Sequence, residues 1–194
     1  MQPANDPYRH FKQFLSVHLE ADDQINEFCR KFKHKTTIQN ELLLSVEEIC
    51  THLYFVNSGC LRIYLLDSNG NESTRFLVTE NKFGTSFPSF KLQEPSLASI
   101  QSLEPSDLLY ITYKDFNVLL NEYPVWERIY RIILEKEYIE SIKRIESLIT
   151  MDAKQRYQTL METNPSFIQR FPSRMIADYL GISQETLSRL KSKK

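Results

Sequence analysis

The sequence lacks the features of membrane-spanning, secreted and disulfide-rich proteins. It contains no run of eighteen apolar residues, and its N-terminus has no apolar core of the kind that a signal peptide needs. The three cysteines, Cys29, Cys50 and Cys60, form no CxxC pair, so the spacing typical of zinc and iron-sulfur sites is absent. We therefore expect a cytoplasmic protein with reduced thiols, no bound metal and no membrane contact.

Catalytic signatures are absent as well. The sequence has no G-x-S-x-G motif, no Walker loop and no zinc-type pairing of cysteines. The adjacent carboxylates of Glu47 and Glu48 would point to opposite faces of a strand and could not share a substrate. The sequence therefore predicts neither an enzymatic activity nor a cofactor.

The residues that are present are typical of a folded protein with an uneven charge. The chain has 194 residues, of which 41% are hydrophobic and 25% charged, enough for one large domain or two small ones. Residues 151–194 hold eight Lys or Arg and four Asp or Glu, a net charge of +4, whereas the remainder carries −5. Positive charge on the C-terminal segment favours contact with phosphates.

The stretch SRMIADYLGISQETLSRL, residues 173–190, has the pattern of two helices joined by a tight turn. Ala177 is the small residue where the helices cross, Gly181 suits a left-handed turn, and Ser183 can cap the second helix. The inward apolar positions are filled by Ile176, Leu180, Ile182, Leu187 and Leu190.

Polar side chains would face outward from the second of these helices. Arg can form two bonds with guanine, Gln can pair with adenine, and Glu can accept a bond from cytosine. The outward set comprises Gln184, Glu185, Ser188 and Arg189, which predicts a helix that reads bases in a major groove. An ordinary helical hairpin with a solvated polar face is the alternative.

Two changes of period divide the rest of the chain. Apolar spacings of three and four predict helices over residues 7–31, with Asp22 as a cap, and a period of two predicts short strands over residues 32–112. Asn57-Ser58-Gly59 has the composition of a hairpin turn, and a second turn follows at Asp67 to Asn71. Many short, evenly spaced strands predict an antiparallel, jelly-roll-like double-stranded β-helix.

The segment from Val125 to about Thr150 predicts a long helix with too many apolar residues for one face. One stripe can lie on the β-roll, and a second can form a seam with a copy of itself. This dimerisation stripe comprises Tyr138, Ile142, Ile145 and Ile149. A single buried helix in a monomer is the alternative.

The predicted fold class is α+β, with three parts along the chain. Residues 1–124 form a β-roll domain with N-terminal helices, residues 125–151 a long dimerisation helix, and residues 152–194 a helix-turn-helix domain. This order resembles the Crp/Fnr superfamily of bacterial transcription regulators. FVNSGCLRIYLLDSNGNE is similar to the family's strand-turn-strand stretch, and LGISQETLSRL is similar to its recognition segment.

The resemblance implies a homodimer that binds palindromic double-stranded DNA, with RNA polymerase as a further partner. It implies base contacts by Gln184, Glu185 and Arg189 and backbone contacts by Ser183 and Thr186. The full predicted DNA-binding set is Ser173, Arg174, Ser183, Gln184, Glu185, Thr186, Ser188, Arg189 and Lys191.

The roll departs from the cyclic-nucleotide-binding members of that superfamily. Their Phe-Gly-Glu motif is Phe83-Gly84-Thr85 here, their later Arg-Ser pair is Pro95-Ser96, and no Arg occurs between Arg75 and Arg128. A buried phosphate would lack its charged partner, so we expect no cAMP binding and leave the small-molecule effector, if there is one, unidentified. A pocket is predicted at Phe83, Gly84, Thr85, Ser86, Leu97 and Ser99.

The superfamily's usual β-hairpin wing is also truncated or absent after the second helix. Lys191, Lys193 and Lys194 either substitute for it as phosphate contacts or form a frayed end. Two alternatives for the function as a whole are a small-molecule-binding or metal-dependent cupin-like roll, for which only His34 and His52 are available, and a roll that only mediates protein contacts.

Overall fold

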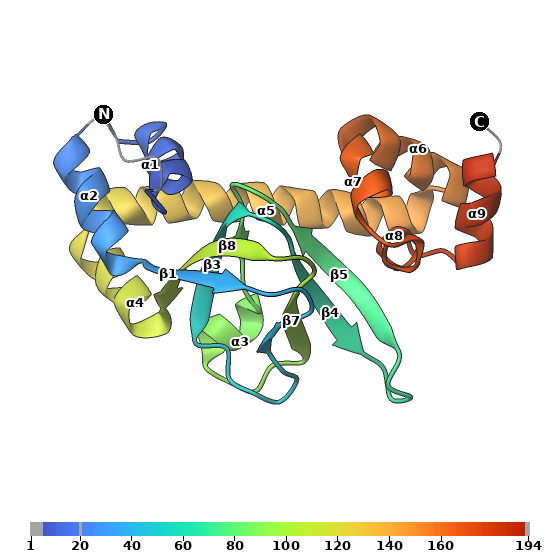
Figure 1. The fold of residues 1–194 in the computed structure, drawn as a ribbon, viewed down its shortest axis with the longest axis horizontal. Helices are drawn as coiled ribbons and strands as arrows, with labels where there is room; N and C mark the ends of the chain where they lie inside the picture. The colour runs from blue at the N-terminus through green and yellow to red at the C-terminus, as the bar shows by residue number, and fades with distance from the viewer. Residues whose placement is uncertain (1–5, 20, 193–194) are drawn as a thin grey trace. The chain divides into compact units, whose positions relative to one another are not determined.

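The computed structural model of the protein describes residues 6–19 and 21–192 and divides into two compact units. The roll unit is Met1–Ile129 and the helical unit is Tyr130–Lys194. The long helix α5 (Pro124–Thr150) contributes residues to both (Figure 1). None of the helices formed by the described residues is long and apolar enough to span a lipid bilayer.

Two four-stranded antiparallel sheets form the centre of the roll unit (Figure 1). The first sheet has the order β1 (Lys33–Thr37), β8 (Ser106–Thr112), β3 (His52–Ser58) and β6 (Phe83–Gly84). The second has the order β2 (Leu42–Leu44), β7 (Ala98–Ser102), β4 (Leu61–Leu66) and β5 (Glu72–Val78). The predicted antiparallel double sheet is therefore confirmed.

Strands β3 and β8 are buried on both faces because helices cover the first sheet from outside. Phe55 in β3 is fully buried, and its ring centroid lies 5.1 Å from that of Phe11 in α1 (Arg9–Ser16). Each aromatic pair of this kind adds about 1 kcal/mol beyond the burial of its area. Trp126, at the start of α5, belongs to the same core, and its ring centroid lies 5.4 Å from that of Phe28 in α2 (Asp22–Lys31).

The turn at Asn57-Ser58-Gly59 is a corner between the two sheets, so the prediction of a hairpin was wrong. Strand β3 pairs with β6 and β8, whereas β4 pairs with β5 and β7. The local composition specifies a reversal of the chain, but the partner of each strand is chosen by distant residues. The second predicted turn does join paired strands, because Leu66 is opposite Glu72 and the Asp67 carboxylate accepts from the Asn69 and Asn71 amides at 2.8 Å.

The predicted helices of residues 7–31 are present as α1 and α2, but Asp22 does not cap α2. Asp22 is the first residue of that helix, and the N-cap residue is Ala21. Helix α2 lies beside α4 (Tyr113–Glu122) at one end of the roll (Figure 1). A further short helix, α3 (Phe87–Leu92), lies in the irregular stretch after β6 and was not predicted.

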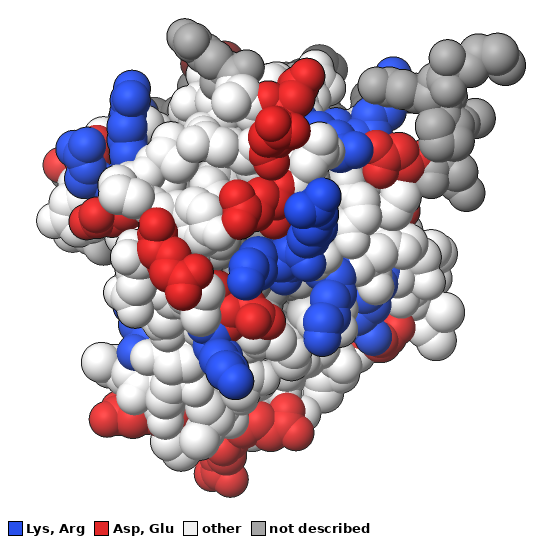
Figure 2. Space-filling model, turned by 90° about the vertical axis from the view of Figure 1, so that its left-hand side faces the viewer, with Lys and Arg blue, Asp and Glu red and all other residues white. Residues whose placement is uncertain are grey.

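Figure 2 shows acidic and basic side chains lying side by side on the face that is turned to the left in Figure 1. One ion pair of the roll unit, between Lys35 Nζ and Glu41 Oε1, has a separation of 2.9 Å. Interspersed charges of both signs are typical of a solvated surface. Charges of both signs are therefore mixed on the described part of this face.

Four short helices follow α5 in the helical unit. They are α6 (Ala153–Thr163), α7 (Pro165–Arg170), α8 (Ser173–Leu180) and α9 (Gln184–Ser192). Helix α6 begins at a reciprocal capping box, in which Asp152 Oδ1 accepts from the Gln155 amide at 2.8 Å and Gln155 Oε1 accepts from the Asp152 amide at 2.9 Å. This box starts α6 directly after the end of the long helix.

We predict that Gly59→Ala destabilises the roll unit far more than Gly70→Ala. Both glycines have positive φ, +97° and +79°, which costs an alanine about 1 kcal/mol. At Gly59 a Cβ would also lie 2.1 Å from Ser106 Oγ, whereas nothing lies within 4 Å at Gly70, so overlap should raise the Gly59→Ala cost to about 3 kcal/mol. Urea unfolding followed by Trp126 fluorescence measures both, and equal losses would contradict the corner geometry.

Candidate nucleic-acid interface

Helices α8 and α9 are joined by the tight turn that the sequence predicts. Gly181 has φ +64° and ψ +42°, in the left-handed region. The Ile182 amide donates to the Ala177 carbonyl at 3.0 Å, and the Gly181 amide donates to the Asp178 carbonyl at 3.0 Å. These bonds satisfy two carbonyls of the last turn of α8, and the chain then turns into α9.

The apolar side of this helix pair is inward, as the spacing predicts. Ala177 is 1% exposed at the crossing, and Ile176, Leu180 and Leu187 are equally buried. Ile182 and Leu190 are only half-buried, so the ends of the apolar set reach the rim of the module. Burial of the central residues fixes which side of α9 faces outward.

Ser183 caps α9 as predicted. Its Oγ accepts from the Thr186 amide at 3.2 Å and lies 3.1 Å from Thr186 Oγ1. The cap satisfies one of the free amides of the first turn. It also leaves Gln184 and Glu185 as the first two residues of the helix, both of them exposed.

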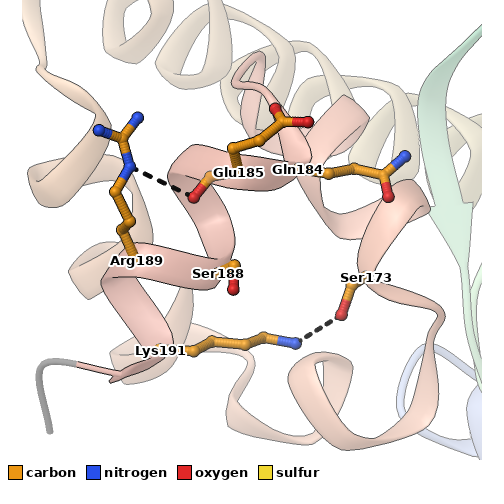
Figure 3. Close-up of a pocket in the computed structure, with 6 residues that line it drawn as sticks. All are labelled: Ser173, Gln184, Glu185, Ser188, Arg189 and Lys191. Carbon is orange, nitrogen blue, oxygen red and sulfur yellow. Dashed lines mark hydrogen bonds between the residues drawn. The ribbon is translucent and has the colours of Figure 1, made fainter.

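Six of the predicted DNA-contacting side chains line one open hollow of about 580 Å³ (Figure 3). Within it, Lys191 Nζ donates to Ser173 Oγ at 2.8 Å, which links the end of α9 to the start of α8. The six are Ser173, Gln184, Glu185, Ser188, Arg189 and Lys191. Of the other three, Arg174 and Ser183 are exposed and Thr186 is half-buried; Lys193 and Lys194 lie outside the described residues.

Glu185 and Arg189 are exposed charged side chains of this surface. Backbone hydrogen bonding at the start of α9, followed by the Ser183 hydroxyl, lowers the pKa of Glu185, so this carboxylate is an acceptor at neutral pH. Arg189 Nε donates to the Glu185 carbonyl at 3.4 Å (Figure 3), and Nη2 lies 3.3 Å from Thr186 Oγ1. Both contacts are long and exposed, so the guanidinium can exchange them for stronger ones.

The six residues predicted to form an effector pocket differ in their contacts and in their exposure within the roll unit. Thr85 Oγ1 donates to the His52 carbonyl at 2.9 Å, and Ser86 Oγ accepts from Ser96 Oγ at 2.7 Å. Leu97 is 80% exposed and Ser99 is 3% exposed. Phe83 packs on the aromatic rings of α1, and Gly84 approaches Val78.

A different hollow, of about 490 Å³, is described on the roll, and none of these six residues lines it. Its lining comes from β2, from β3 and from the loop between them: Leu43, Leu44, Glu48, Ile49, Cys50, Thr51, His52 and Tyr54. No sequence signal marked this loop. Among the described residues, no three His, Cys, Asp or Glu side chains converge on a metal position.

The predicted dimerisation stripe on α5 leaves large apolar side chains in solvent. Tyr138, Ile145 and Ile149 are 68%, 52% and 77% exposed, and Ile142 is half-buried. Ile139, outside the predicted stripe, is also 52% exposed. The described part of α5 thus carries several exposed large apolar side chains at helical spacing.

Comparison with known proteins shows similarity to a domain family and to a transcription regulator. Residues 37–123 match the model of the cyclic nucleotide-binding domain. Over 186 residues the chain is 23% identical to the transcriptional regulatory protein btr of Bordetella pertussis, covering 90% of this chain and 73% of that protein.

Solved structures extend the likeness over both units. FixK2 from Bradyrhizobium japonicum superimposes with a TM-score of 0.71 at 16% identity, covering 84% of this chain and 83% of that one. A putative regulator of the Crp/Fnr family from Eubacterium rectale gives 0.68 at 18% identity, covering 92% and 85%. Residues 37–123 therefore resemble a cyclic nucleotide-binding domain, and the chain shares its fold with these two solved structures.

We predict that Ser183→Ala weakens α9 by about 1 kcal/mol, because the first-turn amides lose their acceptor. Hydrogen exchange at the amides of α9 measures the loss. Ser188→Ala is the matched control, since Ser188 lies inside the same helix, where alanine is at least as favourable. Equal exchange in the two variants would contradict the capping role.

Proposed function

We propose that the protein is a homodimeric, sequence-specific DNA-binding transcription regulator. The observation that carries this proposal is the single exposed surface formed by Ser173, Gln184, Glu185, Ser188, Arg189 and Lys191. Gln184 and Glu185 lie in the first turn of α9, and Arg189 lies one turn further on. A recognition helix contacts base edges with its N-terminal turns.

The chemistry of the surface suits a duplex. Arg189 can pair with guanine, Gln184 with adenine, and the ionised Glu185 with the amino group of cytosine. On this proposal Ser173, Arg174 and Lys191 contact phosphates of the same groove, and the net charge of +4 on residues 151–194 attracts those phosphates. The proposed base-reading groups share one surface with the proposed phosphate contacts Ser173 and Lys191.

Pairing of two chains would present two such surfaces to one palindromic site. The exposed stripe of Tyr138, Ile142, Ile145 and Ile149 supplies the apolar area for that pairing. Burial stabilises by about 25 cal/mol per Å² of apolar surface, so a seam of these side chains on both protomers can hold a dimer. RNA polymerase is the further partner proposed for such a regulator at a promoter.

We further propose that cAMP is not the effector. At the two positions where cyclic-nucleotide-binding relatives need a carboxylate and a guanidinium, the chain has Thr85 and Pro95. The Thr85 hydroxyl is engaged with the His52 carbonyl, and Pro95 forms a β-bridge with Ile49. A cyclic phosphate at this place would be buried without a cation from these positions.

Replacing Gln184, Glu185 and Arg189 together by alanine should abolish base preference. The probe is the duplex that the wild-type chain enriches from a random-sequence library, with calf-thymus DNA as the non-specific reference. Affinity for the enriched duplex should fall by about a hundredfold or more, while affinity for calf-thymus DNA should change little. Enrichment of the same sequence by the triple variant would show that another surface reads the bases.

Ile149→Glu should convert the dimer into a monomer in analytical ultracentrifugation. The new carboxylate would be buried in the seam without a partner. Lys136→Glu, also at an exposed position of α5, is the control and should leave the dimer intact. The assigned stripe would be contradicted if both variants were monomers or if both were dimers.

A further inference from the structure

Arg156 in α6 binds the carbonyl ends of two other segments of the helical unit. Its Nη1 donates to the Met151 carbonyl at 2.5 Å, at the end of α5. Its Nε donates to the Leu180 carbonyl at 2.8 Å, and Nη2 lies 3.4 Å from the Gly181 carbonyl, at the end of α8. One guanidinium therefore joins the end of the long helix to the turn before α9.

The acceptors of Arg156 are backbone carbonyls at the C-terminal ends of two helices. The last carbonyls of a helix have no partner inside the helix, and together they form the negative end of its dipole. Arg156 is half-buried, so its bonds are less screened than those of a surface side chain. The capping box of Asp152 and Gln155 holds the first turn of α6, and with it Arg156, at a fixed orientation.

Two further contacts join the same parts of the unit. The Arg144 guanidinium in α5 lies 4.1 Å from the ring centroid of Tyr179 in α8. Leu148 in α5 lies against the turn, since a Cβ on Gly181 would be 3.0 Å from Leu148 Cδ2. The second half of α5 thus contacts the helix pair through a cation-π pair, an apolar contact and the Arg156 bridge.

We propose that Arg156 is a positioning residue for DNA recognition, which sets the orientation of α9 relative to α5. The proposal rests on the proposed function and adds to it a residue that fixes the spacing of the two reading helices. Half-sites of a palindrome are read at a fixed spacing, and the two reading helices must match it. If α5 pairs with its copy, a rigid joint between α5 and the helix pair fixes that spacing.

The alternative role for Arg156 is a phosphate contact, which requires different properties of the side chain. A phosphate contact needs only positive charge, so lysine would retain most of the binding, and loss of the charge would lower the salt slope by about 0.9. A bridge between separate carbonyls needs the planar fork of arginine, which lysine cannot reproduce. Arg156→Lys therefore separates the two roles.

The experiment compares Arg156→Lys and Arg156→Gln with wild type, and uses Lys154→Gln, an exposed basic residue of the same helix, as the control. The probes are the enriched duplex, the same duplex with its half-sites one base pair further apart, and calf-thymus DNA, each over a range of salt. We expect both Arg156 variants to bind the enriched duplex about tenfold more weakly with an unchanged salt slope. They should also lose the wild-type preference for the original spacing.

Arg144→Gln, which weakens the same joint from the other side, should shift the spacing preference in the same direction and serves if Arg156→Gln is poorly folded. Retention of the wild-type preference by folded Arg156→Lys overturns the proposal. A salt slope lowered by about 0.9 in Arg156→Gln, with lysine restoring affinity, also overturns it.

Hydrogen exchange at the Gly181 and Ile182 amides provides a readout without DNA. Faster exchange at these amides in Arg156→Lys supports the joint, and unchanged exchange overturns it. If the wild-type chain enriches no duplex, the proposed function fails, and this exchange measurement still decides whether Arg156 holds the turn.

Discussion

The close approach of α8 and α9 depends on one backbone conformation, the left-handed turn at Gly181. The amides of Gly181 and Ile182 close the end of α8, which leaves Ser183 free to begin the next helix as its cap. With the turn set, burial of Ile176, Ala177 and Leu187 fixes the rotation of α9. The polar side chains of α9 are then outward because no other side remains for them.

The two units differ in how much apolar and polar surface they leave exposed to solvent. The roll unit buries aromatic side chains between a sheet and covering helices, and its described polar groups at Thr85, Ser86 and Ser96 are used in internal hydrogen bonds. The helical unit instead leaves both an apolar stripe and a polar surface in solvent. Uncovered surface of these two kinds is what a protein needs in order to bind a copy of itself and a charged polymer.

Sequence patterns were most reliable where the determining contacts are local. The helix-turn-helix has its turn, cap and inward residues within eighteen positions, and the structure has the turn, the cap and the central inward residues as predicted. The Asn57-Ser58-Gly59 corner was misjudged because a chain reversal is local but the choice of strand partner is not. Asp22 was predicted as the cap of α2, but the cap is the preceding residue, Ala21. Helix α3 was not predicted, because the proline and serines of its stretch show no helical period.

The sequence by itself determined the fold class, the order of the parts and the outward set on α9, since periodicity and turn chemistry depend on neighbouring residues. Only the tertiary structure decided which predicted side chains share a surface and that Arg156 bridges two helix ends. Those outcomes depend on distances between residues far apart in the chain. Packing sets such distances, and no local pattern records them.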